Sequence, residues 1–149
     1  FVASLARPGG NVTGLDVSEK MLEIAEKKFP PKFGVKFVKG DMCNIPFKDA
    51  SFDLVIANFV IVHLKNLEKA FDEVYRVLKD GGTFIVTNIN QKKSPKLFLK
   101  DTDEIYIRSF YHIPKQVVKA LENSLFKIES EEFVNEGEVW INQVVKARK

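Results

Sequence analysis

Two aspartates that each follow a strand-like stretch are the first candidates for chemistry in this sequence. Asp16 ends the stretch of residues 11–16, and Asp41 comes soon after the stretch of residues 35–38. The carboxyl ends of parallel strands meet at one edge of a sheet, and ligands of open α/β sheets bind at that edge. A carboxylate there can accept hydrogen bonds from the two hydroxyl groups of a ribose or from the exocyclic amine of an adenine.

Each aspartate by itself has an ordinary structural explanation, as a turn or helix-capping residue. The pair is more informative, because an apolar residue, Val17 or Met42, follows each acid. Two acids on consecutive strands with apolar neighbours form a constellation large enough for a nucleoside. The pair therefore favours nucleoside binding over two unrelated turns.

The stretch after the second acid contains a further candidate, Asn58. Residues 40–47 are polar and turn-prone, whereas residues 52–58 form a bounded apolar run. Such a run is typical of a strand buried on both faces at the centre of a parallel sheet. Its end at Asn58 is predicted to reach the same edge as Asp41.

Composition and charge narrow the class of protein. The 149 residues are 45% hydrophobic and 29% charged, which predicts one globular domain with a packed core. A net charge of +3 is too small to indicate nucleic-acid binding. The single cysteine excludes an internal disulfide, no apolar run approaches the ~20 residues of a membrane span, and no signal peptide is visible. A cytoplasmic protein with no membrane partner is therefore expected.

The remaining pattern positions these residues on alternating strands and helices. Residues 1–6 resemble the end of a helix, and Gly81 with Gly82 is expected to terminate a later one. Strands are expected at residues 11–16, 35–38, 52–58 and 83–87, and helices after Ser18, Asn66 and Pro114. Alternation of this kind predicts an α/β domain with a parallel sheet.

The last third of the chain departs from a purely parallel arrangement. Residues 126–134 and 139–145 are extended runs joined by a turn so short that they must be antiparallel neighbours. The predicted fold is therefore a doubly wound, mostly parallel sheet with a C-terminal antiparallel hairpin, in one domain spanning residues 1–149. Residues 90–107 are basic and irregular, and either a solvated loop or a substrate-gripping lid explains them.

Four stretches resemble, in this order, motifs of the class I S-adenosylmethionine-dependent methyltransferases of the type 11 kind. Residues 12–22 are similar to the motif after the first helix, and residues 40–47 to the adenine-binding motif. Residues 51–58 are similar to motif IV, and residues 76–84 to the helix-to-strand signature that follows it. The resemblance implies a Rossmann-like fold, S-adenosylmethionine as cofactor, and transfer of its methyl group to an unidentified small-molecule or protein acceptor.

The resemblance also implies roles for individual residues around the nucleoside. Asp16 would hold the ribose, and Asp41 together with Met42 would hold the adenine. Val17 and Met21 would line the nucleoside pocket. The catalytic residue stays unassigned, because the methyl donor is already activated and the protein mainly positions the reactants and excludes water.

Further residues fall nearer the expected point of methyl transfer. Asn58 and Phe59 would border the methionine half of the cofactor and its methyl group. His63 lies where the family often has a histidine, and either a catalytic base or a histidine packed at a helix start explains it. His112 is expected on the surface or in a loop, and Cys43 as a buried spectator. Neither histidine has partners at metal-ligand spacing, so no metal site is predicted.

One departure from the family concerns its glycine-rich loop, which is absent because the first residues already lie in the following helix. The strand before that loop is central in the family's sheet, and without it two strands would bury unpaired backbone groups. The domain is therefore expected to be N-terminally incomplete, with upstream residues in the parent protein. Two alternatives to a methyltransferase are a non-catalytic binding or scaffold protein with the same fold, and a nicotinamide-dependent oxidoreductase. The closing hairpin and residues 40–47 argue against the second alternative.

Overall fold

The chain forms two compact units, Phe1–Pro46 and Phe47–Lys149. The structure is a computed structural model, and it describes residues 11–29, 34–92, 96–97, 105–106 and 108–149. The helix end expected for residues 1–6 lies outside the described residues. No helix of the described part is both long enough and apolar enough to span a bilayer.

The first unit is built on a parallel pair of strands, β1 (Val12–Asp16) and β2 (Val35–Lys39). Helix α2 (Glu19–Lys28) connects them, as a parallel pair requires a crossover. The helix begins after Ser18 because the Ser18 hydroxyl accepts a hydrogen bond from the Met21 N–H at 3.3 Å. The predicted strands and helix cap of this region are confirmed.

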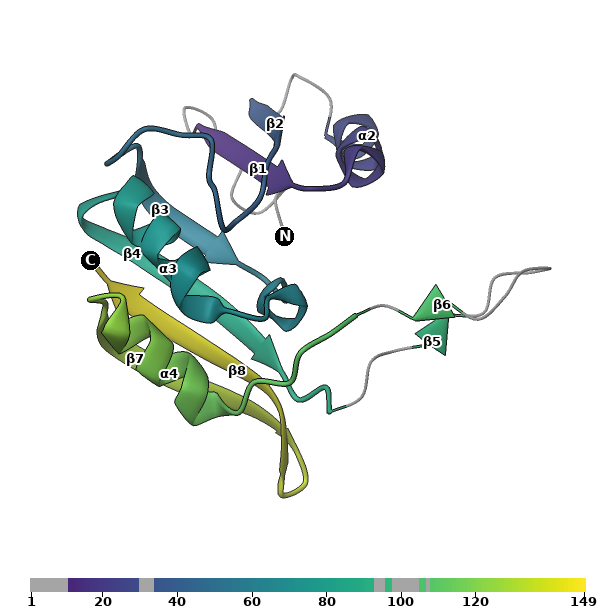
Figure 1. Cartoon of the computed structure of the whole chain (residues 1–149), viewed down its shortest axis with the longest axis vertical. Helices are drawn as coiled ribbons and strands as arrows, with labels where there is room; N and C mark the ends of the chain where they lie inside the picture. Colours follow the sequence, from purple (N-terminus) through teal and green to yellow (C-terminus); the bar gives the residue numbers. More distant parts are fainter. Residues whose placement is uncertain (1–10, 30–33, 93–95, 98–104, 107) are drawn as a thin grey trace. The chain divides into compact units, whose positions relative to one another are not determined.

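The second unit contains a four-stranded sheet of order β3–β4–β8–β7 (Figure 1). Its strands are β3 (Phe52–Ala57), β4 (Leu78–Ile89), β7 (Lys127–Glu136) and β8 (Val139–Arg148). β3 and β4 are parallel, whereas β8 runs antiparallel to both β4 and β7. The predicted α/β class with a C-terminal antiparallel hairpin is confirmed.

Two helices, α3 (Leu67–Val77) and α4 (Pro114–Asn123), lie on one face of this sheet (Figure 1). The short 3₁₀ helix η2 (Ile61–His63) follows β3. Phe71 of α3, Phe84 of β4 and Phe126 before β7 meet at ring-centroid distances of 5.3–5.5 Å and are almost fully buried. These rings form the core that fixes α3 against β4.

The boundary between α3 and β4 differs from the prediction that Gly81 and Gly82 end the helix. Helix α3 already ends at Val77, and Leu78 is extended, with φ −74° and ψ 140°. Leu78 is completely buried and pairs with Phe52 of β3, so packing of its side chain overrides the local helix stop. The glycines lie inside β4, where Gly81 has a φ of 71° that suits glycine.

Most of residues 93–107 lie outside the described residues, apart from two-residue strands β5 (Lys96–Leu97) and β6 (Ile105–Tyr106), which pair in antiparallel fashion. Whether this segment is a lid or a loop therefore stays a prediction. In the described ranges, β1 pairs only with β2 and β3 only with β4.

Candidate functional site

Asp16 lies at the carboxyl end of β1 and begins the turn into α2. Its Oδ1 atom accepts a hydrogen bond from the Ser18 N–H at 2.8 Å, which fixes the carboxylate at the start of the helix. No described residue donates to its second oxygen, Oδ2. This oxygen therefore retains its capacity to accept hydrogen bonds from a ligand.

Asp41 lies in the turn that follows β2 and has a similar arrangement. Its Oδ1 accepts from the Cys43 N–H at 2.8 Å, and its main-chain oxygen accepts from the Asn44 N–H at 2.9 Å. Within the described ranges, Oδ2 of Asp41 also has no donor. The turn is built around glycine, because a Cβ atom at Gly40 would lie 2.6 Å from the Leu15 side chain.

The parallel register brings the two aspartates to the same end of the β1–β2 pair. Asp16 is the register partner of Lys39, and the Gly40 N–H donates to the Asp16 carbonyl at 3.0 Å. Asp41 therefore follows one residue after a direct backbone contact with Asp16. Lys39 also bonds Glu19 at 2.6 Å, and this hydrogen bond lowers the pKa of the Glu19 carboxyl.

Apolar side chains accompany this pair of acids, as the sequence predicts. Val17 is 64% exposed and Met21 is 53% exposed, whereas Met42 is half-buried. Exposed large apolar residues next to two free acceptor oxygens are the two kinds of group that a nucleoside requires. The acceptor oxygens and apolar side chains of the first unit therefore fit the ribose and adenine of S-adenosylmethionine.

Asn58 and Phe59 lie in the second unit, immediately after β3. Phe59 has a φ of 55°, which is rare outside glycine, and its N–H donates to the Thr87 hydroxyl at 2.7 Å. The same hydroxyl donates to Asn58 Oδ1 at 3.0 Å. Thr87 of β4 thus fixes the turn that contains both predicted residues, and a backbone in this conformation is typical of functional sites.

The two histidines differ from their predicted environments. His63 is the last residue of η2 and is exposed, with Nδ1 3.4 Å from the Arg108 carbonyl, so it does not pack at a helix start. His112 was expected on the surface but is 92% buried, since its exposed fraction is 8%. The cause is a long-range contact, because the Phe110 N–H donates to the Val62 carbonyl at 2.7 Å and draws this segment onto η2.

Buried His112 has a structural role in this arrangement. Its Nε2 lies 2.8 Å from the Leu64 carbonyl and 3.2 Å from the Ile61 carbonyl, so Nε2 must carry a proton and donate. Its own carbonyl accepts from Asn88 of β4 at 2.9 Å. Cys43 is half-buried rather than fully buried. No group of metal-binding side chains occurs among the described residues.

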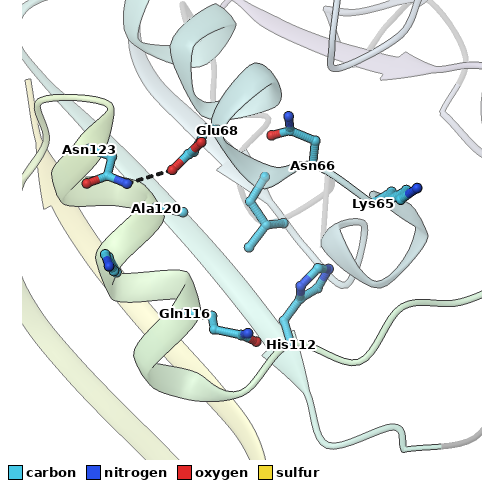
Figure 2. A pocket seen from close by; sticks show the side chains of 9 residues that line it. Lys65, Asn66, Glu68, His112, Gln116, Ala120 and Asn123 are labelled. Carbon is cyan, nitrogen blue, oxygen red and sulfur yellow. Dashed lines mark hydrogen bonds between the residues drawn. The ribbon is translucent and has the colours of Figure 1, made fainter.

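A hollow of the second unit does not contain the predicted residues. Figure 2 shows this hollow, which has a volume of about 750 Å³ and lies between α3 and α4. Glu68 and Asn123 close one end through a hydrogen bond of 2.6 Å. Its described lining residues are Lys65, Asn66, Leu67, Glu68, His112, Gln116, Lys119, Ala120 and Asn123. A second hollow, in the first unit, lies at the start of β2 and away from Asp16.

Comparison with known proteins identifies the family. Residues 1–86, more than half of the chain, match the family model of a methyltransferase domain. The chain belongs to this methyltransferase family. The predicted membership of the class I S-adenosylmethionine-dependent methyltransferases is thereby confirmed.

Curated relatives of this methyltransferase chain are much longer than the matched region. A demethylmenaquinone methyltransferase of Staphylococcus epidermidis is 40% identical over 86 residues, which are 58% of this chain and 36% of the relative. One of Staphylococcus aureus is 40% identical over 88 residues, 59% of this chain and 36% of the relative. The match thus spans little more than a third of the length of these relatives.

Solved methyltransferases show the fold over nearly the whole chain. An S-adenosylmethionine-dependent methyltransferase of Mesorhizobium loti has a TM-score of 0.76 at 19% identity, with 95% of this chain and 82% of that chain covered. One of Methanosarcina mazei has a TM-score of 0.77 at 20% identity, with 98% and 85% covered. The predicted Rossmann-like fold is confirmed by these similarities.

Sequence reasoning missed Thr87, although a signal for it was present. Ala57 and Val86 are register partners in the parallel pair β3–β4, so Asn58 and Thr87 each follow directly after them. A polar residue one position beyond the end of a buried parallel strand can bond its neighbour across the pair. That reasoning needs the register, which the sequence pattern alone does not provide.

Proposed function

We propose that this methyltransferase chain binds S-adenosylmethionine and supports transfer of its methyl group to a small-molecule acceptor. The observation that carries the proposal is the meeting of Asp16 and Asp41 at one end of the β1–β2 pair. Each has a carboxylate oxygen to which no described residue donates. One such oxygen suits the ribose hydroxyls, and the other suits the amine of the adenine.

The bound cofactor supplies a sulfonium methyl group that is already activated for transfer. The protein's part is to bind and orient, and Val17, Met21 and Met42 would cover the faces of the nucleoside. Asn58 and Phe59, held by Thr87, would border the methyl group and exclude water from it.

We further propose that both compact units belong to one methyltransferase domain. The support is that the Mesorhizobium loti methyltransferase aligns with 95% of the chain, which includes most of each unit. The acceptor that the relatives suggest is of the quinone class, since they are named demethylmenaquinone methyltransferases. We infer a planar, uncharged aromatic acceptor on this ground.

Isothermal titration of S-adenosylmethionine into the protein tests the cofactor proposal. Saturable binding is expected, and the absence of saturation at millimolar cofactor contradicts the proposal. Saturable binding without methylation of any quinone-class acceptor would instead favour a non-catalytic binding protein.

The variant Asp16→Asn makes this test specific for the ribose ligand. An asparagine keeps an oxygen for the Ser18 N–H but replaces the free carboxylate oxygen by a donor group. The affinity for S-adenosylmethionine should fall at least about tenfold, because hydrogen bonds to charged groups are worth roughly 1.5–3 kcal/mol. Glu19→Gln removes one negative charge from the same unit without touching the proposed ligands, and this control should leave the affinity unchanged. Equal affinities of wild type and Asp16→Asn would refute the role of Asp16.

A further inference from the structure

Three aromatic residues, Tyr111, Phe133 and Trp140, form a cluster at one end of the second unit. The Tyr111 and Trp140 rings are 6.5 Å apart between centroids and inclined by 22°, so they stack. Phe133 meets Trp140 edge-on, at 6.4 Å and 77°. We name these three residues the aromatic cluster. Phe133 is 44% exposed, and the other two side chains are half-buried.

The aromatic cluster lies where β4 ends. Asn90 directly follows β4, and its Nδ2 donates to the Trp140 carbonyl at 2.6 Å. Among the described residues, no group donates to its side-chain oxygen. Its N–H also donates to the Ile141 carbonyl at 2.9 Å. Gln91 bonds the Ser109 hydroxyl at 3.3 Å and so brings the segment with Tyr111 to the same place.

This is the end of the sheet at which the methyl group is proposed to be transferred. β3 and β4 are parallel, so Asn58 and Phe59 after β3 and Asn90 after β4 leave the sheet at its carboxyl end. The β7–β8 hairpin extends past α4 at this end (Figure 1). Phe133 pairs with Gln143, whose amide donates to the Pro114 carbonyl at the start of α4. Phe133 therefore points to the helix-covered face, just beyond the helix.

The charges of the hairpin restrict what can bind to the aromatic cluster. Residues 128–145 contain five glutamates and no lysine or arginine. One of them, Glu129, is neutralised by ion pairs with Arg148 and Lys146 at 2.8 Å. The other four, all exposed, are Glu131, Glu132, Glu136 and Glu138. A negative field of this kind disfavours nucleic acid, anionic lipid surfaces and anionic small molecules, and favours an uncharged ligand.

We propose that the aromatic cluster binds the planar, uncharged aromatic ring of the methyl acceptor. Exposed rings at a sheet end where ligands enter supply stacking surface, and a planar ring stacks on them better than an aliphatic or flexible molecule does. The inference rests on the proposed function, since it assigns the acceptor side of the same reaction. It makes Tyr111 and Phe133 specificity-determining residues, distinct from those that hold the cofactor.

Fluorescence of Trp140 tests this proposal directly, because Trp140 is the single tryptophan of the chain. The probe is menadione (2-methyl-1,4-naphthoquinone), titrated without S-adenosylmethionine while tryptophan emission is recorded with correction for absorption by the probe. Saturable quenching is expected. Linear quenching without saturation, which reports collisions only, overturns the proposal. Because no cofactor is present, this result is independent of whether S-adenosylmethionine binds.

Matched variants separate the aromatic cluster from the rest of the hairpin. Phe133→Ala and Tyr111→Ala should each weaken menadione binding about fivefold, as expected for loss of one aromatic contact. Val139→Ala is the control. Val139 is 58% exposed on the same hairpin, but its side chain points to the opposite face of the strand because it is adjacent to Trp140 in the sequence. Phe133→Leu keeps an apolar side chain and guards against misfolding as the cause, and its affinity should fall between those of wild type and Phe133→Ala. Unchanged affinity in both alanine variants overturns the proposal.

A charged analogue tests the electrostatic part of the argument. 1,4-Naphthoquinone-2-sulfonate has the same ring system with one negative charge. It should bind more weakly than menadione, and the difference should shrink at high salt because the exposed glutamates are screened. Tighter binding of the sulfonate would overturn the assignment of an uncharged ligand.

Discussion

Leu125 has a backbone conformation that few residues other than glycine adopt. Its φ is 66°, and it directly follows Ser124, the C-cap residue of α4. The Phe126 N–H donates to the Leu121 carbonyl and the Leu125 N–H to the Glu122 carbonyl, both at 3.0 Å. These two bonds define a Schellman motif, in which the position of Leu125 normally holds glycine. The leucine gains little in return, because it is 73% exposed.

Replacing this leucine by glycine should stabilise the protein. Leu125→Gly removes the steric cost of the left-handed conformation, so the free energy of unfolding should rise by about 1 kcal/mol. Urea unfolding followed by circular dichroism measures the change. Leu125→Ala is the control, because alanine keeps the Cβ atom and should give no gain. A gain of the same size from alanine would show that loss of the exposed side chain, and not the backbone conformation, is the cause.

At the residue scale, the sequence predicts the environment of a side chain whose hydrogen-bond partners are close in sequence. It does not predict the environment of a side chain whose partners are distant in sequence. The positions of Asp16 and Asp41 after their strands were predictable because strand ends and turns are visible in short stretches, and each carboxylate accepts from an N–H two residues away. His112 was misplaced because its partners, the carbonyls of Ile61 and Leu64, lie about fifty residues earlier in the chain. Thr87 was missed for a similar reason, since its two partners are reached only through the β3–β4 register.

Among the elements, strands β7 and β8 are held to each other by side-chain charges as well as by backbone hydrogen bonds. Glu129 of β7 accepts from Arg148 of β8 at 2.8 Å and pairs with Lys146 at 2.8 Å. The hydrogen bond from Arg148, followed by that from Lys146, lowers the pKa of Glu129 from 4.5 to about 2. The carboxylate is thus stabilised in the folded hairpin relative to the unfolded chain.

This ion-pair network should make stability depend on pH in acid. Since the folded pKa lies below the unfolded one, the contribution of Glu129 is complete above about pH 4.5 and is lost as the pH falls to about 2. In Glu129→Gln, the free energy of unfolding from urea titrations at pH 2–6 should fall less steeply with decreasing pH. Glu132→Gln is the control, because Glu132 has no basic partner in the described ranges and should leave the slope as in wild type. Identical slopes for all three proteins would contradict the prediction.

The ends of elements were harder to predict than the elements. The periodicity of residues after Asn66 predicts α3, and Asn66 caps it by accepting from the Lys69 N–H at 3.2 Å. The predicted C-terminal end of α3 was wrong, because Leu78 is buried in the sheet and no local sequence pattern indicates that burial. Tertiary packing decided the outcome there over the glycine pair, whose helix-ending tendency is worth only about 1 kcal/mol per residue.

At the scale of the whole molecule, the two units differ in how much apolar surface they bury. Val35 and Ile45 are the buried apolar residues in the described part of Phe1–Pro46. Phe47–Lys149 instead has a continuous core in which Phe71, Phe84 and Val145 are completely buried. Burial of apolar area is the main stabilising contribution, at about 25 cal/mol per Å². The first unit therefore has much less to hold it folded on its own.

This difference predicts two levels of protection against amide hydrogen exchange. Amides paired between β4 and β8, such as Val86 and Val145, should exchange only on global unfolding, whereas those paired between β1 and β2 should exchange through local opening. Exchange followed by mass spectrometry at near-neutral pH measures both sets in one sample, so the second unit is the internal control for the first.

Addition of S-adenosylmethionine at about ten times its dissociation constant should slow exchange in β1 and β2 by roughly tenfold, because binding adds about 1.4 kcal/mol to the free energy of opening of the unit that holds the nucleoside. Asp16→Asn should reduce that slowing to about twofold or less at the same cofactor concentration, because its affinity is expected to fall at least about tenfold, while leaving β4 and β8 unaffected. Equal protection of the two units without cofactor would instead mean that they unfold as one cooperative body, and the buried side chains of the second unit would then have to stabilise the first as well.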